Sequence, residues 1–292
     1  MSDTPHSISL AAQLPAARRR PRRRLPVSPG VVAALGVLAI LLVAIAAPSV
    51  ISPADPLRGN VLHSLQAPDA SHWFGTDRLG RDVLARVVHG ARYSLLIGLG
   101  AMAISVLGGV VLGIIAGLRN KILDEAASRV FDVLSAFPSV LLALLVVTFL
   151  GASMSHIAIA IGISGIPKFG RVVRAQTQLV READYVTHAV LYGKGRISVF
   201  MRHLLPNVLV AVPVIATLDI GTAILAVSGL SFLGLGPQPP TPEWGVMLAD
   251  SRDVLRVAWW PSVFPGVALT ATVIAFTVLG RALQASFERR SR

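Results

Sequence analysis

Long apolar stretches without charged residues constrain this chain more than any other feature. Crossing the hydrocarbon core of a bilayer takes roughly 20 apolar residues in a helix. Four stretches reach that length: 31–51, 93–118, 208–233 with one Asp inside, and 257–280. A fifth, 133–167, lacks Asp, Glu, Lys and Arg but is too long for one helix. We predict two helices there, hinged near Gly151-Ala152-Ser153, the second extending past Lys168 and Arg171, whose long stems reach toward water. The sequence thus predicts an all-α polytopic membrane protein with six transmembrane helices.

Composition agrees with a lipid environment. Hydrophobic residues make up 53% of the 292 residues and charged residues 14%, with a mean hydropathy of +0.67. Those polar side chains are too few to cover a water-soluble globule of this size. A net charge of +12 suits nucleic acid only if it lies on one soluble face, whereas here Lys and Arg gather in tails and loops. We therefore expect no nucleic-acid partner, and the absence of cysteine excludes disulfides and thiolate metal sites.

Loop charge predicts the orientation, because segments rich in Lys and Arg stay on the cytoplasmic side. With the N-terminus inside, the cytoplasmic segments hold 20 Lys and Arg and the outer loops hold 7. We predict a multi-pass protein of the bacterial cytoplasmic (inner) membrane with both termini cytoplasmic. Its predicted parts are a disordered Arg-rich cytoplasmic tail (1–28), a first transmembrane helix (29–52), a periplasmic loop (53–92), a five-helix core (93–285) with a cytoplasmic loop (171–206), and a cytoplasmic C-terminal tail (286–292).

The Arg-rich start, followed by apolar residues ending in AIAAP, leaves a cleaved signal peptide open as an alternative. The apolar stretch is longer than the usual signal core of about 7–15 residues. Its removal would leave five helices and reverse one terminus, so we favour a first transmembrane helix.

Sequence patterns for covalent chemistry are absent. The chain has no HExxH, no GxSxG and no GxxxxGK[ST] loop, and Gly193-Lys194 lacks the upstream glycine and the following hydroxyl that phosphate binding requires. We therefore predict a transport subunit rather than an enzyme, with no cofactor and no metal. Its energy must come from other proteins.

A few residues within the apolar stretches carry specific expectations. Asp219 is the one acidic residue deep within a predicted span, and we assign it to the translocation pathway or a helix contact, and Thr222 and Ser228 to the pathway. Thr217 and Thr222 are expected to satisfy its oxygens, and a proton relay through Asp219 stays open. Three glycines spaced four apart predict a smooth ridge for helix packing: Gly109, Gly113 and Gly117.

The polar segment 171–207 predicts a helix, a glycine turn and a second helix. Apolar residues recur at helical spacing in its first part, and Gly193 and Gly195 suit a chain reversal. Ile197, Phe200 and Met201 predict a short amphipathic helix, closed by Pro206 before the next span. A solvated connector is the alternative to a contact surface.

This segment resembles the cytoplasmic signature of inner-membrane permeases of ABC importers, in which E-A-A is followed by three residues, G, nine residues, I, one residue and L-P. Four positions match: Ala189, Gly193, Leu205 and Pro206. Three depart from the pattern: Thr187, His188 and His203. Two nearby acidic residues are candidates to replace the glutamate: Glu182 and Asp184.

Two longer stretches are similar to the second permease of dipeptide and oligopeptide importers, the DppC/OppC-like family. They are HWFGTDRLGRDVLARVVHGARYSL at 72–95 and LSFLGLGPQPPTPEWGVMLADSRD at 230–253. The resemblance implies a MetI-like permease fold with a coupling hairpin between the fourth and fifth helices. It further implies a subunit that forms half of a peptide pathway through the membrane, beside a homologous second permease, two ABC ATPase subunits, an extracytoplasmic peptide-binding protein and membrane lipid.

Relatives of such permeases carry nickel chelates, haem or glutathione, so these substrates stay open, as does a secondary transporter from another class. The resemblance assigns contact with an ATPase to the hairpin, with a charged rim and a packed surface of Tyr185, Val186 and Ala189. The candidate coupling residues are Arg181, Glu182, Asp184, Tyr185, Val186, Thr187, His188, Ala189, Gly193 and Lys194.

The outer loops are expected to form the docking surface for the binding protein. We interpret 72–92 as an interfacial helix and assign neither Asp77 nor Arg81 to substrate. Three tryptophans suit the headgroup level of the membrane: Trp244, Trp259 and Trp260.

Overall fold

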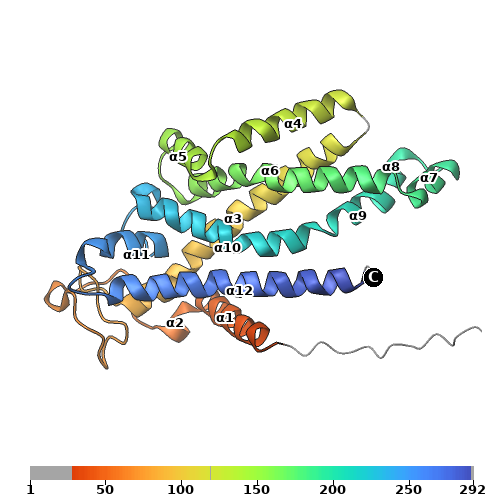
Figure 1. The fold of residues 1–292 in the computed structure, drawn as a ribbon. Helices are drawn as coiled ribbons and strands as arrows, with labels where there is room; N and C mark the ends of the chain where they lie inside the picture. Colours follow the sequence, from red (N-terminus) through yellow and green to blue (C-terminus); the bar gives the residue numbers. More distant parts are fainter. Residues whose placement is uncertain (1–27, 119, 291–292) are drawn as a thin grey trace, which may run out of the picture.

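The computed structural model describes residues 28–118 and 120–290, which form a bundle of helices (Figure 1). Five helices are long and apolar enough to cross a membrane. They are α1 (Pro29–Ala46), α3 (Val83–Gly117), α6 (Met154–Arg181), α10 (Val212–Leu230) continued by η3 (Ser231–Leu235), and α12 (Trp260–Arg290). A bent pair, α4 (Lys121–Ala136) and α5 (Ser139–Leu150), makes a sixth if it is counted as one span. The predicted all-helical membrane fold is confirmed, while the predicted tail 1–28 lies outside the described residues except for its last residue.

Prolines break two of the predicted spans. Phe137, before Pro138, has an extended backbone (φ −100°, ψ 138°), and α4 and α5 meet at 91°. Ala47, before Pro48, also leaves the helical region, and a short α2 (Pro48–Ile51) follows. A proline disfavours helical backbone in the residue before it. The predictions of single straight helices over 29–52 and from 133 to the hinge were therefore wrong.

The predicted hinge after the third span is confirmed. Helix α5 ends at Leu150, and Gly151 follows with φ +86°, a conformation that glycine adopts without steric cost. The Ser153 hydroxyl then caps α6 by accepting from His156 N at 3.2 Å. From there α6 runs without a break through Pro167 and the first charged residues, so a long helix carries Lys168.

Two predicted boundaries move outward. Helix α3 begins at Val83 because the Asp82 carboxylate caps it, accepting from Ala85 N at 2.7 Å, so the predicted loop 53–92 ends ten residues earlier. Residues 83–92 are thus the first turns of α3 rather than a separate interfacial helix. At the other end of the chain, α12 continues to Arg290, so most of the predicted tail 286–292 is helical.

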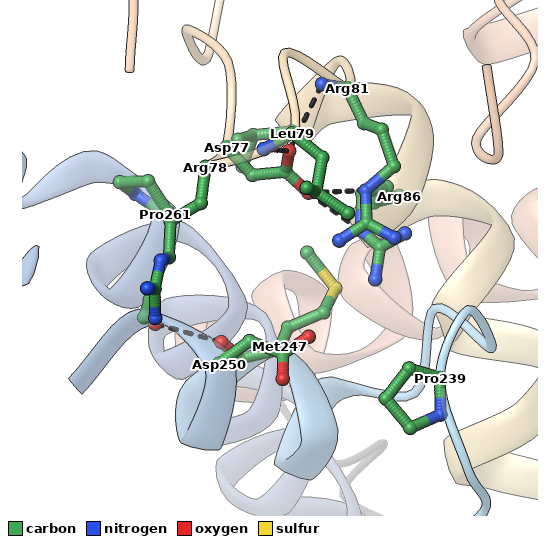
Figure 2. Close-up of a pocket in the computed structure, with 11 residues that line it drawn as sticks. Asp77, Arg78, Leu79, Arg81, Arg86, Pro239, Met247, Asp250 and Pro261 are labelled. Atoms are coloured by element: carbon green, nitrogen blue, oxygen red, sulfur yellow. Dashed lines mark hydrogen bonds and ion pairs between the residues drawn. The ribbon is translucent and has the colours of Figure 1, made fainter. Parts of the chain in front are cut away.

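The loop 52–82, which contains the short η1 (Val61–His63), is tied to the helices by specific polar contacts. Trp260 Nε1 donates to Thr76 O at 3.0 Å, and His72 Nδ1 lies 2.8 Å from Asp82 Oδ2. Asp77 accepts from Arg81 of the same loop and lies within ion-pair distance of Arg86 in α3 (Figure 2). These contacts fix the loop over the ends of α3, α12 and α11 (Trp244–Ser251), which η4 (Arg252–Val254) follows.

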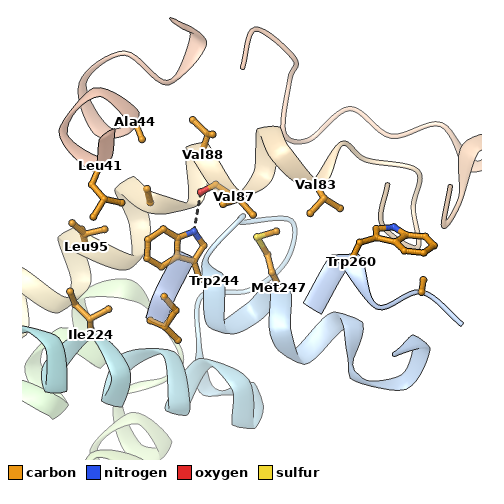
Figure 3. Packing of buried hydrophobic residues seen from close by; sticks show 13 residues of the cluster. Leu41, Ala44, Val83, Val87, Val88, Leu95, Ile224, Trp244, Met247 and Trp260 are labelled. Atoms are coloured by element: carbon orange, nitrogen blue, oxygen red, sulfur yellow. Dashed lines mark hydrogen bonds between the residues drawn. The ribbon is translucent and has the colours of Figure 1, made fainter. Parts of the chain in front are cut away.

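Trp244 lies at the centre of the apolar core beneath this loop (Figure 3). It is 1% exposed, and its Nε1 donates to Val87 O at 2.9 Å. Trp260 is also buried, whereas Trp259 is half exposed. Trp244 and Trp260 therefore face the protein interior, where backbone carbonyls accept from their N–H groups, and the headgroup level of the three tryptophans stays a prediction.

The segment after α6 contains α7 (Asp184–Leu191), α8 (Arg196–Val199), η2 (Phe200–Leu204) and α9 (Leu205–Leu209). This hairpin lies at the opposite end of the bundle from the 52–82 loop and α11 (Figure 1). Pro206 does not close the second helix as predicted. It stands in the first turn of α9, where a helix tolerates the missing N–H, and the chain stays helical from α8 through η2 into α9.

Candidate functional site

The turn of the hairpin is built on a left-handed glycine. Helix α7 ends at Leu191, and Gly193 has φ +75°. Two backbone bonds close the turn, from Gly193 N to Val190 O at 2.9 Å and from Lys194 N to Ala189 O at 3.2 Å. The predicted helix, glycine turn and second helix are all present, with Gly193 rather than Gly195 (φ −62°) in the unusual conformation.

One face of the hairpin packs on its own subunit. Val186 and Ala189 are each 5% exposed and belong to a buried cluster with side chains of α6, α8, η2 and α9. Neither is free to form the packed surface that was predicted for an ATPase. An amphipathic helix beside a long helix buries its apolar face there first, so the outward face must supply any contact with a partner.

The outward face of the hairpin is unusually apolar for a surface outside the membrane-spanning helices. Leu191, Tyr192 and Ile197 are 75%, 84% and 81% exposed. The other candidate coupling residues with exposed side chains are Glu182, Asp184, Tyr185, Thr187, His188 and Lys194. Lys194 places its Nζ 3.2 Å from His203 Nε2. Arg181 instead donates to Gly117 O at 2.9 Å and pairs with Glu182.

A second candidate region lies between α6 and α10, where Lys168 and Asp219 form an ion pair. Thr222 Oγ1 also donates to Asp219 Oδ1 at 2.6 Å, as predicted, whereas Thr217 Oγ1 donates to Pro213 O at 2.6 Å. Asp219 therefore has an ionisable partner in its own chain. The sequence did not indicate this partner, because Lys168 lies 51 positions away from Asp219.

The exposure of this pair determines what can face it. The Lys168 side chain is 56% exposed and lies near the middle of α6. A charge in the hydrocarbon region costs up to about 2.5–3.5 kcal/mol on insertion scales, more than the 0–1 kcal/mol or so that an exposed ion pair returns, and the long stem of Lys168 lets its ammonium group reach toward water. Water or another protein is therefore a more favourable neighbour than lipid for this face of α6 and α10.

Ser228 does not belong to this exposed face. It is 2% exposed, and a Cβ on Gly245 of α11 would lie 2.4 Å from its carbonyl oxygen. The close approach of α11 buries Ser228 inside the subunit, so its tentative assignment to the pathway is corrected. Asp219 and Thr222 are the two predicted pathway residues that the structure brings together.

The glycine ridge of α3 faces α6. A Cβ on Gly109 would lie 2.4 Å from Phe169 Cβ, and one on Gly113 would lie 2.6 Å from Gly170 O. Gly117 meets Thr177 in the same way. The three glycines let the two helices approach at backbone distance, which holds α6, and with it Lys168, in place.

Known proteins similar to this chain indicate its family. A family model described as "Binding-protein-dependent transport system inner membrane component" matches residues 109–292. The dipeptide transport system permease protein DppC of Alkalihalophilus pseudofirmus is 41% identical over 256 residues, covering 88% of this chain and 84% of that protein. The di/tripeptide permease DppC of Pseudomonas aeruginosa is 42% identical over 220 residues, covering 75% and 73%.

A glutathione transport system permease protein, GsiD of Pectobacterium atrosepticum, is 38% identical over 219 residues, covering 75% of this chain and 73% of that protein. Among solved structures, an amino acid ABC transporter with histidines has a chain that superposes with a TM-score of 0.54 at 15% identity, covering 70% of this chain and 94% of that one. That likeness shows the fold alone. Taken with the family match over more than half of the sequence, the curated relatives show that this chain belongs to the binding-protein-dependent transport system inner membrane components, the permease subunits of ABC importers.

Proposed function

We propose that this permease forms half of an ATP-driven translocation pathway for short peptides across the cytoplasmic membrane. The names of its relatives support the substrate class: two are dipeptide or di/tripeptide permeases, and glutathione, named for a third, is itself a tripeptide. The pathway is completed by a homologous second permease. Peptide arrives from an extracytoplasmic binding protein, and two partner ATPases hydrolyse ATP.

The exposed apolar face of the hairpin is the observation that carries this proposal. Leu191, Tyr192 and Ile197 expose large apolar side chains beside the Gly193 turn, and clustered exposed apolar groups mark protein contacts. Because the sequence has no phosphate-binding loop of the GxxxxGK[ST] type, energy must arrive through such a contact. The hairpin, with Thr187, His188 and Lys194 around the apolar side chains, is the proposed ATPase-coupling element.

The face with Lys168 and Asp219 is the proposed pathway wall. Charged side chains are unfavourable against lipid, and a paired Lys and Asp present no net charge to a passing solute. We place it against the second permease, with the space between the two subunits as the route for peptide.

The arrangement of the two ends supports an orientation with both termini cytoplasmic. The end of α12 lies on the same side of the bundle as the hairpin, and the 52–82 loop lies on the opposite side (Figure 1). If the hairpin meets cytoplasmic ATPases, the C-terminus is cytoplasmic too and the loop faces the binding protein. The excess of Lys and Arg in the predicted inner segments, 20 against 7, agrees.

The test uses the assembled importer in proteoliposomes. Uptake of a labelled dipeptide should require ATP and persist when a proton ionophore collapses the proton gradient. A cysteine replacing exposed Thr187 should crosslink to an ATPase subunit, with a yield that changes on adding ATP and vanadate, whereas Ser71→Cys in the outer loop should not. Ionophore-sensitive uptake without ATP, or no crosslink from Thr187→Cys in an assembled complex, would reject the proposal.

A further inference from the structure

A pocket of about 270 Å³ lies at the outer end of the subunit, between the 52–82 loop, the start of α3 and α11 (Figure 2). Neither the pathway nor the coupling element uses it. Its apolar lining consists of Leu79, Val83 and Met247, with prolines from the loop before α11 and from α12. The charged groups that line it are Asp77, Arg78, Arg81, Arg86 and Asp250.

Two buried guanidinium groups share one carboxylate in this pocket. Arg81 is 6% exposed and Arg86 is 1% exposed. Arg81 Nε donates to Asp77 Oδ2 at 2.6 Å, and Arg86 Nε lies 3.5 Å from the same oxygen. Two guanidinium groups thus share one carboxylate in surroundings that screen poorly, while the other carboxylate that lines the pocket, Asp250, pairs with neither of them.

Several donors of these arginines remain unused. Arg86 Nη1 donates to the carbonyls of Pro56 and Pro240 at 3.3 Å. Within residues 28–118 and 120–290, by contrast, Arg86 Nη2 and both Nη atoms of Arg81 donate no hydrogen bond. These Nη atoms are not among the fully buried side-chain atoms that lack a partner, which in the described part of the chain are Ser228 Oγ and Ser231 Oγ. They therefore open onto the pocket that both arginines line, where an acceptor that enters it can reach them.

Asp250 of α11 lines the same pocket. It forms no ion pair with the described basic residues, and burial raises the pKa of its carboxyl, an effect that Arg86 and Arg81 partly offset. An ionised Asp250 repels an incoming anion, so its presence weakens rather than builds an anion site. Neutralising Arg81 and neutralising Asp250 should therefore change the affinity for an anion in opposite directions.

We propose that this outer pocket is a carboxylate-binding site, in which Arg81 and Arg86 bind the anion and the apolar wall receives the aliphatic group that carries it. Planar guanidinium groups match the two oxygens of a carboxylate. The carboxylate comes either from the C-terminus of a free peptide or from an acidic side chain of the extracytoplasmic binding protein. The inference rests on the proposed function for its outward orientation, and the experiment separates the two sources.

The test measures two affinities of the assembled importer in nanodiscs. One is for radiolabelled Ala-Ala, with its C-terminal amide as competitor, in the absence of binding protein. The other is for the binding protein that co-purifies with the importer. Each is measured in the wild type, in Arg81→Gln and in Asp250→Asn. Arg252→Gln, a similar change at a 63%-exposed side chain outside the pocket, serves as the control.

The expected result is a pair of opposite changes: Arg81→Gln weakens one of the two affinities by about tenfold, and Asp250→Asn strengthens the same one. Opposite changes for Ala-Ala, with no competition from the amide, assign the site to free peptide; opposite changes for the binding protein assign it to an acidic side chain of that protein. A structural role alone would weaken binding in both variants, and Asp250→Asn still decides the matter if Arg81→Gln fails to assemble. Equal affinities in all variants, or weaker binding in both Arg81→Gln and Asp250→Asn, would overturn the inference. ATP-driven peptide uptake tests the proposed function separately, since it can be normal when this inference is wrong.

Discussion

At the residue scale, the charges of this permease are placed by the cost of exposing them to lipid. Asp219 was visible in the sequence as the one acidic residue deep in a span, yet its role depends on Lys168, which belongs to another helix. No local pattern connects positions 51 apart. The sequence therefore predicts which residue is unusual and leaves its partner to the packing of α6 against α10.

The ion pair gives a prediction that separates a neutral wall from a proton relay. Asp219→Asn leaves the Lys168 charge uncompensated and should lower ATP-driven peptide uptake, as should Lys168→Gln. The double neutral variant removes both charges and should recover most of the uptake, with a coupling energy of about 0.5–1 kcal/mol in a double-mutant cycle. Initial rates of peptide uptake by proteoliposomes measure it.

Asp132→Asn provides the control for this cycle. Asp132 of α4 lies 3.2 Å from Arg171, which is on the same helix as Lys168, and the side chains of Asp132 and Arg171 are 65% and 51% exposed. Because this pair is so exposed, its loss should change peptide uptake little. A relay through Asp219 would show itself differently: uptake would stay abolished in the double variant, and the pH dependence of the remaining activity would shift.

At the element scale, backbone conformation decides where the helices bend, meet and turn. The glycine ridge, the hinge at Gly151 and the turn at Gly193 were all predicted from glycine positions, because glycine acts locally. The break at Pro138 was not predicted, although the proline is visible in the sequence. Hydropathy alone defined the apolar run, and hydropathy does not register the effect of a proline on the backbone before it. The early start of α3 was missed because Arg86, a charged residue, is buried at its first turns.

The ridge gives a stability prediction with a control in the same helix. A Cβ on Gly113 would lie 2.6 Å from Gly170 O and 2.7 Å from Val173 Cβ, so Gly113→Ala must push α3 and α6 apart. We expect a loss of about 1–3 kcal/mol, the usual cost of overpacking. At Gly100 the added Cβ would lie 3.6 Å from Ala158 Cβ, an ordinary contact, so Gly100→Ala should be neutral or stabilising. Thermal unfolding of the purified complex in detergent compares them, and equal midpoints would contradict the ridge.

The hairpin turn gives a functional prediction with a similarly matched pair. A Cβ at Gly193 or Gly195 would meet nothing within 4 Å, so neither substitution is crowded. Only Gly193 has a positive φ, +75°, which a β-branched residue adopts at a cost of about 1–2 kcal/mol or more. Gly193→Val should distort the turn and uncouple ATP hydrolysis from peptide uptake while the protein still inserts, whereas Gly195→Val should transport normally.

The readout is the ratio of peptide taken up to ATP hydrolysed by the reconstituted importer. A low ratio in Gly193→Val with a normal ratio in Gly195→Val supports the coupling role of the turn. Normal coupling in both variants would indicate a solvated connector instead.

At the scale of the whole molecule, the two ends of the bundle differ in what they expose. The hairpin end presents bare apolar side chains such as Tyr192 and Ile197, suited to a protein partner. The opposite end is an ordered loop tied down by ion pairs and by Trp260, with a charged pocket. Composition and loop charge predicted a membrane bundle and its direction, but the outer pocket joins residues from three separate segments and could not be read from any one of them.

This difference makes the orientation of the chain testable. The protein has no cysteine, so a single introduced cysteine reports without background. Ser71 lies exposed in the outer loop, and Ala285 lies exposed near the end of α12. In intact cells a membrane-impermeant maleimide should label Ser71→Cys and leave Ala285→Cys unlabelled, because the proposed orientation places the loop outside and the end of α12 in the cytoplasm. After the membrane is permeabilised, Ala285→Cys should become labelled as well, which shows that its thiol is reactive. Labelling of Ala285→Cys but not Ser71→Cys in intact cells would invert the orientation, and with it the placement of the hairpin on the side of the ATPases.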